Sequence, residues 1–140
     1  MPRITARNPK LPAPKQKKDA MDVKRTIRYW LPVLICMVII FHASSIHGRD
    51  IPPLFPFQDV AFHFFVYLAL CFFFARALKN TYRNMSGIKL IIFTVIFGFI
   101  YGASDELHQA FVPYRSVSCF DVLIDTLGSF AGSLIYRWPR

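Results

Sequence analysis

The sequence predicts an all-α polytopic membrane protein with four transmembrane helices. Hydrophobic residues make up 54% of the 140-residue chain and aromatic residues 16%, and the mean hydropathy is +0.37. This composition is more apolar than that of an ordinary soluble domain. The apolar residues also fall into four runs, each long enough to cross a bilayer core, separated by short polar segments. A chain of this length forms a single domain.

Residues 1–28 are basic and rich in proline, and we expect a flexible cytoplasmic tail that precedes a membrane domain at residues 29–140. Nine of the 17 Lys and Arg residues lie in this tail. A net charge of +9 is also seen in nucleic-acid-binding proteins. Here, however, few basic residues follow the apolar runs, which is typical of charges that set membrane topology. We therefore predict contact with membrane lipids and no nucleic-acid partner.

Four helices are expected at residues 30–46, 59–78, 88–111 and 119–136. The first contains no formal charge, and Pro32 falls in its first turn, where the missing N–H costs little. A proline-rich connection separates it from the second helix, and a basic connection precedes the third. The third helix ends before Pro113, because the residue that precedes a proline disfavours helical geometry. Arg137 marks the end of the fourth helix.

The distribution of basic residues predicts the orientation of these helices. Outside the tail, the basic residues lie mostly at residues 76–89 and at the C-terminus, while the other two connections contain only Arg49 and Arg115. The positive-inside rule then places both termini in the cytoplasm. Six of the eight acidic residues fall at the extracytoplasmic end: Asp50, Asp59, Asp105, Glu106, Asp121 and Asp125.

Polar residues form a stripe on each of the last three helices. Asp59, His63 and Tyr67 are spaced i, i+4, i+8, which places them on one face of the second helix. The stripes of the third and fourth helices are Gly98, Gly102, Glu106 and Gln109, and Asp121, Asp125, Gly128 and Gly132. Each has two glycines at depth, a spacing that permits close helix packing. If the two glycine pairs pack together, the carboxylates of these helices meet near the second helix.

Carboxylates near a membrane are costly, so this cluster is a functional-site hypothesis. Several carboxylates in a poorly hydrated pocket cannot all stay charged without partners. The cations available to them are Arg115, protonated His63 or His108, or a bound metal. Arg115 is suited to pair with a carboxylate or to hold a substrate phosphate.

Four interpretations of the cluster stay open at this point. It is a structural network that joins the helices, an acid/base or nucleophilic enzyme site for an envelope lipid or glycolipid, a ligand-binding or translocation site without chemistry, or a divalent-metal site. The metal ligands in the last case are Asp59, His63, Glu106 and Asp121. The sequence contains no recognised metal-binding spacing such as His-Glu-x-x-His, so we predict no metal and no cofactor.

The three stripes together resemble the VanZ-like family of membrane proteins. The residues that carry the resemblance are Asp59, His63, Phe64 and Tyr67; Tyr101, Gly102, Glu106 and Gln109; and Arg115, Ser116, Ser118, Asp121, Gly128 and Gly132. The chain departs from the family pattern at Val60, where the family has Lys, and at Asp125, where it has Asn. The resemblance covers residues 30–137. It implies a multi-pass protein of the bacterial cytoplasmic (inner) membrane, in a family whose namesake is linked to low-level resistance to the glycopeptide teicoplanin.

We therefore predict an outward-facing polar pocket that recognises, and in one interpretation modifies, an envelope lipid or glycolipid headgroup. If the protein is an enzyme, Glu106 is the acid/base group, Asp121 and His63 orient it, and Asp59 pairs with His63. The expected substrate-binding residues are Arg115, Asp59, Gln109, Tyr67 and Asp125. The alternative is a non-enzymatic membrane binding or assembly protein whose polar cluster is structural.

Overall fold

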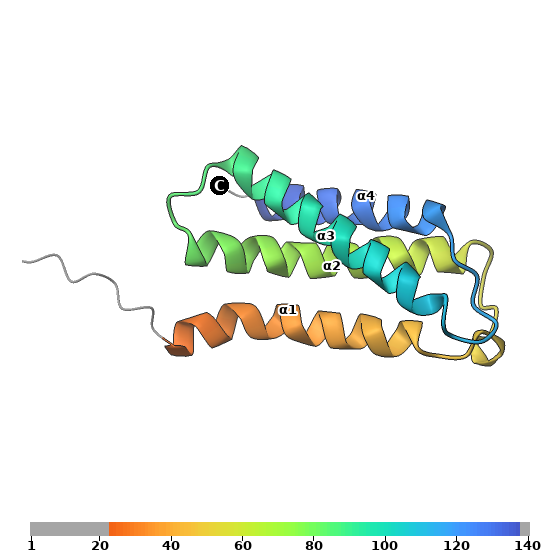
Figure 1. Ribbon diagram of the computed structural model, residues 1–140. Coiled ribbons are helices and arrows are strands. Elements are labelled where there is room, and N and C mark those ends of the chain that lie inside the picture. The colour runs from red at the N-terminus through yellow and green to blue at the C-terminus, as the bar shows by residue number, and fades with distance from the viewer. Residues whose placement is uncertain (1–22, 138–140) are drawn as a thin grey trace, which may run out of the picture.

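The computed structural model describes residues 23–137, which form a bundle of four long helices (Figure 1). The helices are α1 (Val23–Ser44), α2 (Gln58–Thr81), α3 (Gly87–Gln109) and α4 (Cys119–Arg137), and a short 3-10 helix, η1 (Gly48–Asp50), lies between α1 and α2. No β-strand occurs within the described residues. The prediction of an all-α protein with four membrane-spanning helices is therefore confirmed.

The beginning of α1 differs from the prediction. Helix α1 begins at Val23, so residues 23–28 are helical rather than part of the tail. The apolar run marks the part of a helix that fits the hydrocarbon core, but the backbone continues to hydrogen-bond through the basic residues before it. Residues 1–22 of the predicted tail, and 138–140 at the end of the predicted domain, lie outside the described residues.

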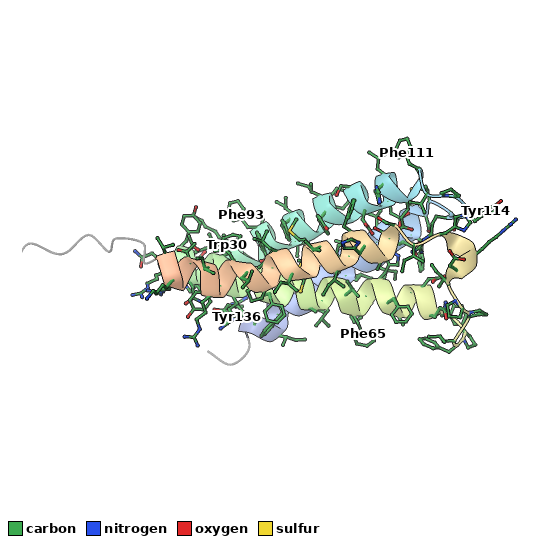
Figure 2. The ribbon with its side chains drawn as sticks, turned by 90° about the horizontal axis from the view of Figure 1, so that it is seen from below. Trp30, Phe65, Phe93, Phe111, Tyr114 and Tyr136 are labelled. Carbon is green, nitrogen blue, oxygen red and sulfur yellow. The ribbon has the colours of Figure 1, made fainter. Side chains whose placement is uncertain are left out.

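All four helices are long and apolar enough to cross a membrane. Their outer faces carry large hydrophobic side chains that no other helix covers. Phe65 on α2 and Phe93 on α3, for example, are exposed and point away from the bundle (Figure 2). Such a continuous apolar exterior is expected of a protein that is solvated by lipid.

Helix α4 packs against α2 and α3, while α1 packs against α2 and α3 on another side of the bundle. The two connections α1–α2 and α3–α4 lie together at one end, which we call the loop end, and comprise residues 45–57 and 110–118 (Figure 1). Helix α1 begins and helix α4 ends at the opposite end (Figure 1). The chain therefore enters and leaves the bundle on the same side.

Glycines allow the close packing around α4. A Cβ atom added at Gly128 or Gly132 would collide with the backbone carbonyl oxygens of Phe64 or Leu68 on α2. The glycines of α3 instead lie against the other side of α4. A Cβ atom at Gly102 would lie 2.8 Å from Oδ2 of Asp125. The two glycine pairs therefore do not pack against each other, the arrangement that the sequence left as a condition, because α4 turns its own glycines toward α2 and its polar residues toward α3.

The two connections at the loop end are joined to each other. The backbone N–H of Gly48 donates to the carbonyl of Pro113 at 3.2 Å, and a Cβ atom at Gly48 would collide with the carbonyl of Tyr114. The guanidinium of Arg49 lies 3.8 Å from the centre of the Tyr114 ring, a cation–π contact. These contacts hold the α1–α2 connection against the α3–α4 connection at the loop end.

Candidate functional site

A cavity of about 290 Å³ lies near the loop end, where α1 meets α2 and α3. Much of its wall is apolar and includes Ile40 from α1 and Phe62 and Val66 from α2. The polar residues that line it are Ser44, Asp59, His63, Tyr67, Asp105, Gln109 and Arg115. A cavity with apolar walls and a few converging polar groups is the usual form of a small-molecule site.

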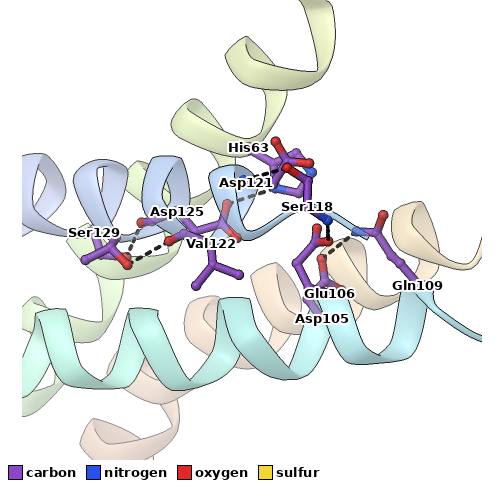
Figure 3. Close-up of polar contacts among 10 residues, drawn as sticks. His63, Asp105, Glu106, Gln109, Ser118, Asp121, Val122, Asp125 and Ser129 are labelled. Carbon is purple, nitrogen blue, oxygen red and sulfur yellow. Dashed lines mark hydrogen bonds and ion pairs between the residues drawn. The ribbon is translucent and has the colours of Figure 1, made fainter. Parts of the chain in front are cut away.

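His63 joins this cavity to a buried polar cluster between α2, α3 and α4 (Figure 3). Its Nδ1 atom lies 2.9 Å from Oδ1 of Asp125, whose side chain is fully buried. Helical periodicity places Asp125 one turn from Asp121 at the start of α4. The pair fixes the orientation of the imidazole ring through Nδ1. The other ring nitrogen, Nε2, takes no part in the contact with Asp125.

Glu106 of α3 is held by the backbone at the start of α4. Its Oε2 atom accepts a hydrogen bond of 2.8 Å from the N–H of Ser118 (Figure 3). The hydroxyl of Ser118 in turn accepts a bond of 3.4 Å from the backbone N–H of Asp121. The Asp121 N–H also donates to the Ser118 carbonyl at 3.0 Å, so it is the Ser118 N–H, just before α4, that depends on Glu106 for a partner. The sequence therefore positions a carboxylate where a helix N-terminus favours one.

Three buried oxygen atoms in this region have no hydrogen-bond partner among residues 23–137. They are the Tyr67 hydroxyl, Oε1 of Glu106 and Oδ2 of Asp125. Buried polar groups are nearly always hydrogen-bonded, and an unpartnered one costs stability. Three such atoms at one end of the bundle are a feature that stability alone does not explain.

Glu106, Asp121 and His63, the three residues predicted to be catalytic, come together in the structure. One ligand atom from each lies within 4.8 Å of the others. The three side chains belong to different helices, so only the packing of α4 between α2 and α3 brings them together. Glu106 and Asp121 do not line the cavity; His63 belongs to both the cavity and the cluster.

The expected substrate-binding residues occupy several environments. Asp59 is exposed and lines the cavity, but His63 pairs with Asp125 rather than with Asp59. Gln109 is buried and its amide donates to Oδ2 of Asp105 at 3.2 Å. Arg115 also lines the cavity, and its guanidinium donates to carbonyl groups at the end of α1, including that of Ala43 at 2.7 Å.

Asp105 is a site residue that the sequence reasoning missed. It is buried, lines the cavity and holds Gln109 in place. The i, i+4 spacing between Asp105 and Gln109 would have placed the two on one helix face. His108 lies apart from the cluster: its Nε2 atom is 3.0 Å from the Ser45 hydroxyl, and its ring stacks on that of Phe41.

Comparison with known proteins agrees with the motifs on these helices. The sequence profile of the VanZ/LLP1 family matches residues 29–140. The chain belongs to the VanZ/LLP1 family. With its four apolar helices, it is a multi-pass membrane protein of that family. No curated protein and no solved structure matches the chain significantly.

Proposed function

We propose that this VanZ/LLP1 protein recognises the headgroup of an envelope lipid or glycolipid at the loop end and modifies it by acid/base chemistry. The observation that carries the proposal is the cavity, which combines apolar walls with polar residues beside the buried cluster. Ile40 and Val66 suit an acyl chain, whereas His63, Asp105 and Gln109 suit a polar headgroup. A lipid offers both surfaces in one molecule.

Arg115 is the proposed contact for an anionic group of the headgroup. A guanidinium has five N–H donors. Two hydrogen bonds to the carbonyl groups of Ala43 and Ile46 hold it at the end of α1. The remaining donors suit a phosphate or carboxylate oxygen, and the first two bonds reduce the conformational freedom lost on binding.

Glu106 is the proposed acid/base group. Its side chain is only 3% exposed, and its two oxygens differ in role, because Oε2 is held by Ser118 while Oε1 has no partner among the described residues. A carboxyl group that is fixed through one oxygen can exchange a proton through the other. Because Glu106 does not line the cavity, its proposed connection to the headgroup runs through His63, which belongs to both the cavity and the cluster. The Asp125–His63 pair and Asp121 orient and tune it.

The loop end is proposed to face away from the cytoplasm, in a bacterial cytoplasmic membrane. The support is the positive-inside rule, because seven of the ten described Lys and Arg residues lie either at the start of α1 or at residues 76–89, which comprise the end of α2, the connection to α3 and the first turn of α3. Helix α1 begins and helix α4 ends on the same side of the bundle, which fits an arrangement with both of these helix ends in one compartment (Figure 1). The headgroup is then that of a lipid in the outer leaflet.

Comparative lipid analysis tests the proposal. Four bacterial strains are compared: one without the gene, and three that express wild type, Glu106→Gln or Asp50→Asn at matched levels in the membrane. Asp50 is an exposed acid at the same end, outside the cavity lining, so its variant is the matched control. We expect one lipid or glycolipid to change its covalent structure with wild type and Asp50→Asn only.

Identical lipid profiles in all four strains contradict the enzymatic proposal. These strains and a fifth, which expresses Arg115→Gln, then test the alternative, in which the cluster is structural and the protein binds or assembles membrane components. Lipids that co-purify with wild type but not with Arg115→Gln support recognition without chemistry. Teicoplanin susceptibility of the four strains shows whether the phenotype linked to the family's namesake extends to this protein.

A further inference from the structure

We infer that His63, Glu106 and Asp121 bind a divalent transition-metal ion. One ligand atom from each residue lies within 4.8 Å of the other two. Zinc binds nitrogen and oxygen ligands at about 2.0–2.2 Å in tetrahedral geometry, so two of its ligand atoms are separated by roughly 3.4 Å. The side chains of the cluster must therefore close by about 1 Å to surround an ion.

The unpartnered oxygen of Glu106 is independent evidence for a ligand at this place. Only 3% of the surface of Glu106 is exposed, and its Oε1 atom has no hydrogen-bond partner among residues 23–137. The side chain extends from α3 toward the start of α4, where Asp121 lies and His63 approaches from α2 (Figure 3). A cation at this point would satisfy the oxygen and offset the repulsion between two carboxylates.

The surrounding hydrogen bonds are those expected around a metal site. Histidine ligands usually donate their other ring N–H to a carboxylate, which fixes the ring and raises its basicity. Asp125 occupies this role, because its Oδ1 atom lies 2.9 Å from Nδ1 of His63 and leaves Nε2 for the ion. The Ser118 N–H fixes Oε2 of Glu106 in the same way.

The ligand set indicates which ion is bound. One imidazole and two carboxylates form a mixed nitrogen and oxygen site, which suits Zn²⁺ or Mn²⁺ better than Mg²⁺ or Ca²⁺, whose ligands are oxygen atoms. Three protein ligands leave positions for water or a substrate oxygen, as in catalytic zinc sites. The sequence predicted no metal because these ligands come from three helices and form no local motif. The binding of the ion does not rest on the proposed function. Its use in headgroup chemistry does, and with Oε1 of Glu106 bound to the ion, Glu106 would act as a metal ligand in place of the acid/base group.

Metal titration of the purified full-length protein tests the inference. The protein is stripped with a chelator in detergent, and Zn²⁺ and Mn²⁺ are titrated separately by calorimetry. We expect one ion per chain, with Asp125→Asn weakening binding by about 10–100-fold. Glu106→Gln and Asp121→Asn should weaken it more, because each removes a charged ligand. Mg²⁺ should compete poorly.

Two variants are matched controls. Cys119→Ser removes an exposed thiol beside the cluster, and His42→Gln removes an exposed imidazole from α1. Neither belongs to the cluster, so both should bind the ion as wild type does. The inference is overturned if wild type binds no ion stoichiometrically, or if the ligand variants bind as tightly as wild type.

The wild type alone provides a second test that does not depend on the folding of variants. Cobalt(II) bound to the stripped wild type should show the visible absorption of a nitrogen and oxygen site. A strong thiolate-to-metal band would instead place the ion on a cysteine and overturn the inference. Metal bound at the cluster with unchanged envelope lipids contradicts only the proposed function, whereas changed lipids without bound metal contradict only the metal site.

Discussion

Nδ1 of His63 on α2 lies 2.9 Å from Oδ1 of Asp125 on α4, and the Asp125 side chain is fully buried. The family that the sequence resembles has Asn at the Asp125 position. A carboxylate oxygen and an amide oxygen can both accept from Nδ1–H of the imidazole, but only the ionised carboxylate also pairs with the charge of a protonated ring. This pair joins the cavity to the cluster, and the first prediction concerns its strength.

A double-mutant cycle on His63 and Asp125 should show a coupling energy of about 1–2 kcal/mol, at the upper end of values for polar contacts in membrane proteins. His63→Leu leaves the buried Asp125 without its partner, whereas the double variant with Asp125→Leu leaves no such group. The double variant should therefore lose less stability than the two single variants added together. Equilibrium unfolding in mixed micelles measures this, and additive losses would show that the contact contributes no coupling.

Gly132→Ala should destabilise the bundle by about 1–3 kcal/mol, the usual cost of overpacking. The added methyl group would collide with the Leu68 carbonyl of α2, and a backbone atom cannot move aside as a side chain does. Gly87→Ala is the matched control, because its methyl group would meet only the flexible Arg137 side chain, at 2.9 Å. Thermal unfolding of both variants provides the comparison. Equal stability would argue against close packing of α4 on α2.

Gly102→Ala should disturb the site as well as the packing. Its Cβ atom would lie 2.8 Å from Oδ2 of Asp125, so Asp125 must move and its bond to His63 must lengthen. We expect the ¹⁵N NMR signals of the His63 ring to shift. Gly98→Ala is the control, because its methyl group would collide with Ser129, which lies one helical turn after Asp125 on α4, and not with Asp125 itself. It should cost stability but leave the His63 signals unchanged; the opposite pattern would place Asp125 elsewhere.

The sequence predicts the number and type of helices well because each membrane-spanning helix needs a long apolar run where it contacts lipid, and such runs are visible in the sequence. Helix boundaries are less well predicted, since lipid contact ends before the helix does. Val23, for example, begins α1 well before the apolar run. A single apolar run does not indicate which other helix its own helix packs against. The spacing of Gly128 and Gly132 shows that they share a face, but only the packed bundle shows that this face meets α2.

For the candidate site too, the sequence predicts which residues share a helix face but not which residues of other helices they contact. The i, i+4 spacing correctly places Asp59 and His63 on one face of α2, and it suggested that they pair. In the bundle, Asp59 stays exposed while α4 brings Asp125 within hydrogen-bonding distance of His63. A contact between helices replaces the expected contact within one helix. Sequence spacing describes a single helix, so it identifies the residues of such a site better than their partners.

Tyr67→Phe should raise the stability of the protein by about 1 kcal/mol and weaken lipid binding. The Tyr67 hydroxyl is buried, lines the cavity side of α2 and has no partner among the described residues, so its removal ends a desolvation cost. Tyr101→Phe is the contrasting variant, because the Tyr101 hydroxyl donates to the Met37 carbonyl at 2.8 Å. It should lose about 1 kcal/mol. Thermal unfolding and lipid retention measure both effects, and a less stable Tyr67→Phe protein would contradict the prediction.

Cys119 offers a direct test of membrane orientation. It is an exposed free cysteine at the start of α4, at the loop end, whereas Cys71 is buried and Cys36 is half-buried within α1. If the loop end faces away from the cytoplasm, a membrane-impermeant maleimide should label Cys119 in intact spheroplasts. Cys119→Ser should abolish that labelling while the protein remains in the membrane.

Labelling only in inverted membrane vesicles would reverse the orientation. It would place the cavity, Arg115 and the His63–Glu106–Asp121 cluster on the cytoplasmic side. The substrate would then be an inner-leaflet lipid, and the basic residues at the opposite end would break the positive-inside rule. Labelling from outside instead supports a site that meets lipids of the outer leaflet. The position of one thiol thus decides which leaflet the proposed chemistry serves.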